Sequence, residues 1–395
     1  MDKKIRIIFY TNCLGRGGAH HTFLAWFELL KPVESFELKI FCHSEGWFSE
    51  QLRLRNLPYE ILPMPRALAE IRHGSWHAKT RTLFRIASMA GGLLRAWIRV
   101  AFMKADVVVL TGGRDFLMLF PLALRRRKHT VTIPQTTDWG KIPMCRMMCQ
   151  VAAKTYAISQ AVAESIIRMK IPANKVSVYP LIYTADHLNF SMSRREVRES
   201  LGIPLDAPVL GMTGVIRFHK GQREAILIFA DVIKRIPHAR LLIAGSAPSD
   251  AADAQAYYTT LCELIDRLGL KKQVLMLGWR DDVSRIMRAM DIMLVPSHDF
   301  EGVPRVILEG LEAGLPLVAT DLPQFKEIIG RFNAGFLHPI DQLPKWVDEI
   351  AALLNDQSRL TEASARARRI WESEYSCKSV RPRIVSAFRE LSACA

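Results

Sequence analysis

Short apolar runs bounded by turn residues recur along the whole chain. Stretches with helical periodicity separate most of them. Continuous apolar runs of this length are typical of strands buried on both faces, as in parallel sheets covered by helices. The pattern therefore predicts an α/β protein. The runs are IRIIFY, ELKIFC, VVVLTGG, TVTIP, TYAIS and VSVYP in the first half, and PVLGMTG, RLLIAG, QVLMLG, IMLVPS and LPLVAT in the second.

The strand pattern pauses near residues 183–205, where TADHLNFSMSRREVRESLGIPLDAP holds a charged, helix-like segment. At 395 residues, the chain is also long for a single core. We expect one domain over 1–190, a second over 205–375, and a last helix over 376–395 packing back on the first. Two such domains are expected to face each other across a cleft, with ligands beyond the carboxyl ends of the strands.

The net charge indicates which partners the protein attracts, and the cysteine content indicates its compartment. The chain has 54 Lys and Arg against 39 Asp and Glu, a formal net charge of +15, which attracts polyanions or anionic lipid head groups. Seven cysteines at irregular spacing fit the reducing cytoplasm better than a disulfide framework. Cys145 and Cys149 have helical spacing, but no second pair accompanies them, so no zinc site is predicted.

The segment TLFRIASMAGGLLRAWIRVAFM, residues 82–103, has the length of a transmembrane helix but contains arginines. Each arginine at the bilayer centre costs about 2.5 to 3.5 kcal/mol, so no span is expected. Its cations fall on one helical face, and RRRK at 125–128 adds a second basic patch. Either this surface docks on anionic lipid, or it is an ordinary surface helix with an apolar core side. The cations are Arg81, Arg85, Arg95 and Arg99, and the apolar positions elsewhere are Leu83, Phe84, Leu94, Trp97 and Ile98.

Two glycine-marked loops open helices directly after strands. Gly15, Gly17 and Gly18 precede the first helix, where backbone amides can approach a phosphate or a sugar. Any tight strand-to-helix turn also favours glycine, so this loop alone is weak evidence for a ligand site. A dinucleotide site would need an acidic residue at the end of strand two, and KIFCHS has none, so NAD is not expected.

The second loop, GMTGVIRFHKGQREAI, adds charge to the same arrangement. Gly214 is followed by Arg217 and Lys220 before a helix begins. Two cations there suit a diphosphate, whose negative charge must be matched when it becomes a leaving group. The alternative is a solvated basic loop. Further along, Gly245 in LLIAGSAP and Trp279 in VLMLGWRDDV could hold a base or ribose, although Trp279 could equally cap the sheet edge.

The stretch PSHDFEGVPRVILEGLEAGLPLVATD places a helix at the exit of a buried strand. Pro304 suits the first helical turn, and Gly302 and Val303 offer backbone amides toward the cleft. Glu301 can accept sugar hydroxyls, and Glu309 can accept ribose hydroxyls. Periodicity also permits a plain solvated face for Glu309, because Arg305, Glu309 and Glu312 fall opposite the apolar side formed by Val306, Ile307, Leu308 and Leu311.

EGVPRVILEGLEAGLPLVATD, together with GVIRFHKG and LLIAG, resembles the retaining GT-B glycosyltransferases of the large GT4 family. The resemblance implies a GT-B fold and activity without a metal or cofactor. It implies that Glu309 binds the donor ribose and that Glu301, Gly302 and Val303 bind the transferred sugar. It also implies that Arg217 and Lys220 neutralise the diphosphate while Gly17 and Gly18 close over it.

Two positions depart from the family pattern. Many relatives carry an arginine where this chain has Val215, so Arg217 would substitute for it. Many also carry a histidine in the first domain where TVTIPQTTDWGK has Gln135, which suggests a different sugar contact. Asp138, His20 and His21 are weak candidates for the acceptor side.

The resemblance predicts hexose transfer from a nucleotide-diphosphate sugar to a lipid-linked acceptor in bacterial envelope polysaccharide synthesis, at the inner face of the cytoplasmic membrane. Two alternatives remain at this stage. One is a GT-B epimerase acting on a free nucleotide sugar, for which no acid–base pair is evident. The other is a basic protein that binds membrane or nucleic acid without catalysis, although no nucleic-acid motif is present.

Overall fold

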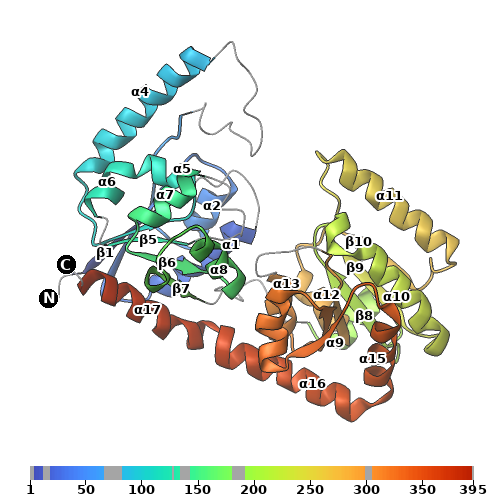
Figure 1. Cartoon of the computed structure of the whole chain (residues 1–395). Helices are drawn as coiled ribbons and strands as arrows, with labels where there is room; N and C mark the ends of the chain where they lie inside the picture. Colours follow the sequence, from blue (N-terminus) through green and yellow to red (C-terminus); the bar gives the residue numbers. More distant parts are fainter. Residues whose placement is uncertain are drawn as a thin grey trace. The chain divides into compact units, whose positions relative to one another are not determined.

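The computed structural model describes residues 4–11, 18–65, 82–126, 129–133, 143–179, 192–298 and 305–393, and the side chains of residues 18–22, 82–89 and 143 lie outside that description. The chain forms two compact units (Figure 1). The first comprises Met1–Thr184 together with Cys377–Ala395, and the second comprises Ala185–Ser376. Each unit contains one sheet, and every strand pairing in the described ranges is parallel.

The first unit has a sheet in the order β3-β2-β1-β4-β5-β6-β7. Its elements are β1 (Ile5–Thr11), α1 (Gly18–Leu30), β2 (Phe36–Cys42), α2 (Trp47–Leu54), β3 (Tyr59–Ile61), α4 (Thr82–Ala101), β4 (Val107–Leu110), α5 (Gly113–Met118), α6 (Phe120–Arg125), β5 (Thr130–Thr132), α7 (Pro143–Val151), β6 (Lys154–Ala157), α8 (Gln160–Arg168), β7 (Val176–Val178) and α17 (Cys377–Ala393).

The second unit has a sheet in the order β10-β9-β8-β11-β12-β13. Its elements are α9 (Arg194–Ser200), β8 (Val209–Thr213), the short 3-10 helix η5 (Phe218–Lys220), α10 (Gln222–Arg235), β9 (Arg240–Ala244), α11 (Ala252–Arg267), β10 (Val274–Gly278), α12 (Val283–Ala289), β11 (Ile292–Val295), α13 (Arg305–Glu312), β12 (Leu317–Thr320), α14 (Pro323–Phe325), β13 (Gly335–His338), α15 (Leu343–Asn355) and α16 (Gln357–Ile370).

The predicted α/β class with parallel sheets is confirmed. Each of the eleven apolar runs contains a strand, from β1 and β2 to β11 and β12. Two strands were missed, β3 and β13. Both lie at sheet edges, where only one neighbour pairs with them, and their residues are only partly buried. An edge strand can do with less apolar sequence, and β3 and β13 lack the continuous runs, whereas the edge strands β7 and β10 have them.

Helix α17 packs on the first unit through aromatic and polar contacts. The ring of Phe388 lies 5.7 Å from that of Trp26 on α1 and 6.4 Å from that of Phe36 on β2. The buried His129 places its Nδ1 2.9 Å from the carbonyl oxygen of Leu391. These contacts tie the last helix of the chain to the sheet that begins it.

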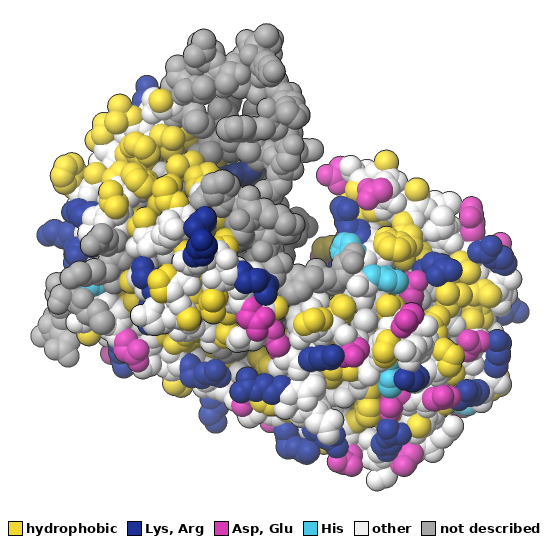
Figure 2. Space-filling view, in the orientation of Figure 1, with side chains coloured by type: hydrophobic (Ala, Val, Ile, Leu, Met, Phe, Trp, Pro, Cys, Tyr) yellow, Lys and Arg dark blue, Asp and Glu magenta, His cyan; other side chains and the backbone are white. Residues whose placement is uncertain are grey.

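Helix α4 carries apolar side chains on two sides. Leu93, Ala96 and Val100 are buried, whereas Leu94 and Ile98 are 57% and 65% exposed. Phe102, directly after the helix, is 84% exposed, and Leu124 on α6 is 50% exposed. Figure 2 shows hydrophobic side chains gathered where Figure 1 places α4, α5 and α6. None of the helices in the described ranges is both long and apolar enough to cross a membrane.

The sequence placed Trp97 among the apolar residues of a surface that could dock on lipid, but the structure packs its side chain inward. Its Nε1 donates a hydrogen bond of 2.7 Å to the carbonyl oxygen of Leu117, and its ring lies 5.8 Å from that of Phe120. The indole therefore packs into the first unit. Phe102, which the expectation did not include, is the exposed aromatic residue at this end of α4.

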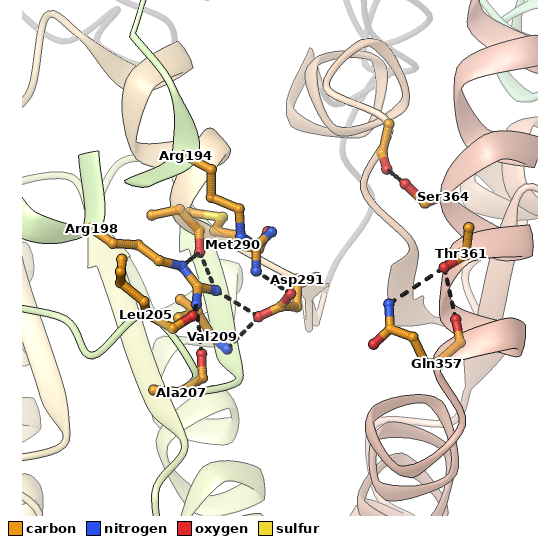
Figure 3. A network of polar contacts seen from close by, with 12 residues as sticks. Arg194, Arg198, Leu205, Ala207, Val209, Met290, Asp291, Gln357, Thr361 and Ser364 are labelled. Atoms are coloured by element: carbon orange, nitrogen blue, oxygen red, sulfur yellow. Dashed lines mark hydrogen bonds and ion pairs between the residues drawn. The ribbon is translucent and has the colours of Figure 1, made fainter. Parts of the chain in front are cut away.

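Arg198 on α9 is a buried hub at the start of the second unit. Its side chain is 2% exposed and donates to the carbonyl oxygens of Leu205, Ala207 and Ala289 at 2.7 to 3.1 Å. It also donates to Asp291 Oδ2 at 2.9 Å (Figure 3). One guanidinium thus joins the end of α9 and the segment just after it to residues 289–291, more than 90 positions from Arg198, because a buried arginine requires partners for its N–H groups.

Asp115 on α5 is a buried carboxyl group in the first unit. It is 1% exposed, Thr111 Oγ1 donates to its Oδ2, and its Oδ1 has no hydrogen-bond partner among the described residues. Burial raises the pKa of Asp115 to about 7, although the Thr111 hydrogen bond and Arg114 oppose the shift. Near neutral pH this group therefore changes between its protonated and ionised forms in the folded state.

This raised pKa predicts how stability depends on pH. Because the folded state holds the proton more tightly than the unfolded state, Asp115 should reduce stability as pH rises from about 4 through 7. Asp115→Asn mimics the protonated form, so its stability relative to wild type should increase over this range, by on the order of 1 kcal/mol per pKa unit. Urea unfolding at pH 5, 6, 7 and 8 measures this. Parallel curves for the two proteins would contradict the prediction.

Candidate functional site

The carboxyl ends of five neighbouring strands lie along one edge of the second sheet, and a loop follows each strand there. Since β10, β9, β8, β11 and β12 are parallel neighbours, their carboxyl ends lie side by side. Gly245 follows β9 with φ 152°, and a Cβ on it would lie 1.8 Å from the carbonyl oxygen of Gly214 after β8. Gly214 in turn donates to Ala244 at 2.9 Å. The two predicted glycines therefore lie together, with their loop backbones in close contact.

The loop after β8 carries the predicted cations. Arg217 precedes η5 and Lys220 ends it. Gly221 follows with φ 77°, and a Cβ there would lie 1.8 Å from the carbonyl oxygen of Pro296 after β11. The buried Gln222 donates from Nε2 to the carbonyl oxygen of Val215 at 3.0 Å. The cationic loop is thus fixed against the exit of the neighbouring strand by contacts that only glycine permits.

The Arg217 side chain is 37% exposed and lies 3.8 Å from Asp253, whose own side chain is 80% exposed. Such an exposed pair contributes little stability, on the order of 0.5 kcal/mol, so an anionic ligand can displace it. Arg217 and Lys220 lie within four residues, on a loop that opens at a sheet edge. Their arrangement suits a multiply charged anion such as a diphosphate.

A histidine–glutamate pair links the exit of β11 to the first turn of α10, and no sequence pattern predicts it. His298 Nε2 lies 2.8 Å from Oε2 of Glu224, a residue on the first turn of α10 that is 6% exposed. The His298 ring stacks on Phe218 with centroids 5.2 Å apart, and its backbone N–H donates to His219. Phe218, in η5, is 61% exposed. The stacking on Phe218 and the backbone bond to His219 therefore hold η5, and with it Lys220, beside the exit of β11.

Helix α13 follows β11 and carries Glu309. The Glu309 side chain is only 12% exposed, and its Oε1 lies 3.1 Å from Arg305 one turn earlier. Glu312 is 4% exposed, so the plain solvated face that periodicity permitted for Arg305, Glu309 and Glu312 is not what the structure shows. The helix packs against β11 and β12 and the segment joining α16 to α17, which leaves little of it in water. A buried carboxylate is costly unless paired, so Glu309 is not a plain surface residue.

Further buried polar atoms at this edge lack hydrogen-bond partners among the described residues. They are Thr213 Oγ1 at the end of β8, Gln222 Oε1 on α10, and both amide atoms of Gln324 on α14. Thr213 is 6% exposed, and Gln222 and Gln324 are fully buried. Leaving such a group unpaired costs about 1 to 3 kcal/mol. Concentrated at one sheet edge, these groups are typical of a binding site for a polar ligand.

Trp279 follows β10 and is 62% exposed, with its Nε1 donating to Asp281 at 3.1 Å. Its ring is therefore available for stacking. Several predicted site residues lie outside the described residues: Glu301, Gly302, Val303, Gly17, Gln135 and Asp138. Gly18 and His20 belong to the first turn of α1, whose side chains are not described.

The family profile described as glycosyl transferases group 1 matches residues 193–370, which covers nearly all of the second unit and its carboxyl-edge loops. Residues 193–370 belong to the glycosyl transferases group 1. A glycosyltransferase family model over these residues, together with relatives that are named glycosyltransferases, supports a transferase of this class. It also confirms the resemblance derived from the EGVPRVILEGLEAG stretch at the level of this family.

Individual relatives agree with the assignment. The chain is 24% identical over 294 residues to the lipopolysaccharide core biosynthesis mannosyltransferase LpsB of Rhizobium meliloti, an alignment that covers 73% of this chain and 72% of the relative. It is 26% identical over 184 residues to a UDP-Gal:alpha-D-GlcNAc-diphosphoundecaprenol alpha-1,3-galactosyltransferase of Escherichia coli, which covers 46% of each protein. The second alignment thus spans less than half of that relative.

Among solved structures, Anabaena Alr3699/HepE in complex with UDP is similar to the whole chain. Its TM-score is 0.80, its sequence identity is 19%, and the superposition covers 98% of this chain and 100% of the other. At this identity the likeness establishes the fold alone. The predicted GT-B fold, two Rossmann-like units each with a parallel sheet, is confirmed.

Proposed function

We propose that the protein is a retaining glycosyltransferase that moves a hexose-type sugar from a nucleotide-diphosphate sugar to a lipid-linked acceptor in bacterial envelope polysaccharide synthesis. The observation that carries the proposal is the carboxyl edge of the second sheet. There the loop with Arg217 and Lys220 packs against the exit of β11, and Glu309, whose side chain is 12% exposed, follows on α13. Relatives whose names specify lipopolysaccharide core and diphosphoundecaprenol substrates support the acceptor class.

In this proposal, each group has one task. Arg217 and Lys220 neutralise the diphosphate, Glu309 accepts hydrogen bonds from the ribose hydroxyls, and Trp279 stacks on the base. Glu301 with the amides of Gly302 and Val303 binds the transferred sugar, and Gly17 and Gly18 approach the diphosphate from the first unit. The two cations supply the positive charge that a metal would otherwise provide, so activity is expected to need no metal.

The proposed reaction keeps the configuration at the anomeric carbon. The bond between that carbon and the diphosphate oxygen breaks, and the acceptor hydroxyl forms the new bond from the same face. The hydroxyl proton passes to the departing phosphate oxygen, so no protein base is required. Arg217 and Lys220 then stabilise the charge on the leaving diphosphate, where preorganised cations have the largest effect on rate.

Glu309→Ala is expected to raise the KM for the donor about 10- to 100-fold, because hydrogen bonds to a charged group contribute about 1.5 to 3 kcal/mol each. Turnover at saturating donor should change much less, since the ribose is remote from the reacting bond. Steady-state kinetics with the preferred donor measure both constants. Glu263→Ala, on the exposed side of α11, is the control. An unchanged KM in Glu309→Ala would refute the ribose role.

A panel of UDP-, GDP- and ADP-sugars tests the function itself. Slow hydrolysis of one donor to a free sugar with retained configuration, unaffected by EDTA, is the expected result. Release of an epimer of the donor sugar instead would favour an epimerase. Binding of anionic lipid or nucleic acid with neither donor binding nor turnover would favour the non-catalytic alternative.

The surface formed by Leu94, Ile98, Phe102 and Leu124 fits the edge of a bilayer. These side chains are 50 to 84% exposed, and Arg95, Lys104 and Arg125 lie among them and are exposed as well. Apolar side chains that enter the head-group region beside cations bind anionic membranes. Each Lys or Arg near such a surface contributes about 1 kcal/mol. Docking there would bring the enzyme to a lipid-linked acceptor on the inner face of the cytoplasmic membrane.

Co-sedimentation with liposomes tests this surface. Wild type is expected to bind vesicles that contain phosphatidylglycerol, to bind less as salt increases, and to bind weakly to pure phosphatidylcholine. The double variant Ile98→Glu with Phe102→Glu should lose most of the binding. Leu54→Glu changes a leucine on α2 that is 70% exposed, and it should have no effect. Equal binding by both variants, or none by wild type, would contradict the membrane role.

A further inference from the structure

A groove of about 320 Å³ lies in the second unit at the amino end of its sheet. Asp291 and Leu315, which line it, come directly before β11 and before β12. The candidate donor site lies after the carboxyl ends of the same strands, so the groove is a separate feature. Its volume is at the lower limit of small-molecule sites, about 300 Å³, which suits a small metabolite.

Positive charge dominates one wall of the groove. Arg194 on α9 and Arg288 on α12 line it, with Arg198 buried behind. Asp291 is the carboxylate among the lining residues, and both Arg194 and Arg198 pair with it (Figure 3). Val209 also donates to it at 2.8 Å. Arg194 and Arg198 thus share one carboxylate, and the oxygens of Asp291 are already used, so the pairing leaves a surplus of positive charge.

Arg194 itself has donor capacity left. It donates to the carbonyl oxygen of Met290 at 3.0 Å and to Asp291, and its side chain remains 45% exposed. A guanidinium has five N–H donors, so these contacts leave several for a ligand. Burial lowers the pKa of Arg198, and the nearby positive charge of Arg194 lowers it further.

The opposite wall and the floor add two further kinds of contact. Gln357, Thr361 and Ser364 on successive turns of α16 lie across from the arginines (Figure 3). Thr361 donates its hydroxyl proton to the carbonyl oxygen of Gln357, and Ser364 donates to that of Gly314, so both hydroxyl oxygens offer acceptor positions to a ligand. The floor contains the side chains of Met287, Met290 and Leu360, which are 0 to 9% exposed. An anion with a hydroxylated carbon skeleton can satisfy all three surfaces, whereas a bare ion would use only the cationic wall.

We propose that this groove binds a small hydroxylated organic phosphate, with the phosphate at Arg194 and Arg288 and the hydroxyl groups toward Gln357, Thr361 and Ser364. The proposal does not depend on which donor or acceptor the enzyme uses. Bidentate contact with a planar guanidinium is a common mode of phosphate binding, and it explains arginine in place of lysine at both positions.

Calorimetric titration of the full chain with glucose 1-phosphate, inorganic phosphate and glucose tests the proposal. Because a sugar phosphate could also occupy the donor site, each titration is repeated with the Arg217→Ala/Lys220→Ala double variant. Glucose 1-phosphate is expected to bind saturably in both proteins, more tightly than inorganic phosphate, and glucose should not bind. Loss of binding in the double variant would assign it to the donor site and overturn the proposal.

Three variants in that background locate the ligand. Arg194→Gln and Arg288→Gln should each weaken binding at least about tenfold, and Thr361→Val should weaken glucose 1-phosphate but not inorganic phosphate. Arg195→Gln, the exposed neighbour of Arg194, is the matched control. Arg288 and Thr361 are exposed, so their variants remain informative should Arg194→Gln fold poorly. Unchanged affinity in Arg288→Gln and Thr361→Val, or no saturation at about 10 mM ligand, would overturn the proposal.

Discussion

Lys220→Ala is expected to lower kcat about 100- to 1,000-fold while the protein stays folded. The Lys220 charge is proposed to act on the diphosphate as the bond to the sugar breaks, and removing one preorganised donor of this kind costs about 3 to 4 kcal/mol of transition-state stabilisation. Its position at the end of η5 is fixed because Gly221 packs against the carbonyl oxygen of Pro296. Steady-state kinetics with the preferred donor give the value.

Two comparisons separate charge from folding. Lys220→Arg keeps the charge and should recover part of the turnover. Lys234→Ala removes a 74% exposed lysine from the same stretch of chain, on α10, and should leave kcat within twofold of wild type. Equal kcat values for wild type and Lys220→Ala would show that the loop cation does not act on the leaving group.

Arg198→Met is expected to destabilise the second unit by about 3 kcal/mol. The substitution leaves the carbonyl oxygens of Leu205, Ala207 and Ala289 without their donor and takes one of two arginines from Asp291. Breaking a buried ion pair from one side typically costs about 3 to 5 kcal/mol, and the remaining Arg194 contact favours the lower value. For a unit of this size, Tm should fall on the order of 10 °C.

Arg195→Met is the matched control on the same helix. Its side chain is 71% exposed and pairs only with Glu199 one turn later, an interaction of small expected value. Differential scanning calorimetry of both variants measures the change in Tm. A Tm for Arg198→Met within a degree or two of the control would contradict the role of Arg198 as the hub of this unit.

Much of the fold was predictable because parallel strands covered by helices must be apolar along their whole length. The strands β1, β4, β8 and β11 satisfy this rule and were visible as uninterrupted runs. The edge strands β3 and β13 were not, since half-exposed positions admit residues such as Glu60 and His338. The other two edge strands, β7 and β10, do carry apolar runs and were predicted, so the residues of a strand decide its visibility in the sequence more than its place in the sheet.

The candidate site was predictable only where chemistry and turn geometry coincide in a short stretch. Arg217, Lys220 and Gly221 share one loop, and Glu309 lies on the helix that follows β11, so local sequence was enough. The Glu224–His298 pair joins residues 74 positions apart, and no periodicity links them. Glu312 is a different case. Helical periodicity places it opposite the apolar side of the helix, but tertiary packing buries it.

The most direct test of the account is a crystal structure of the full chain with a bound nucleotide-diphosphate sugar, at saturating concentration. The account predicts that the diphosphate lies within hydrogen-bond distance of Arg217 and Lys220 and that the ribose hydroxyls contact the carboxylate of Glu309. A ligand bound elsewhere, or bound with those three side chains directed away from it, would contradict the account.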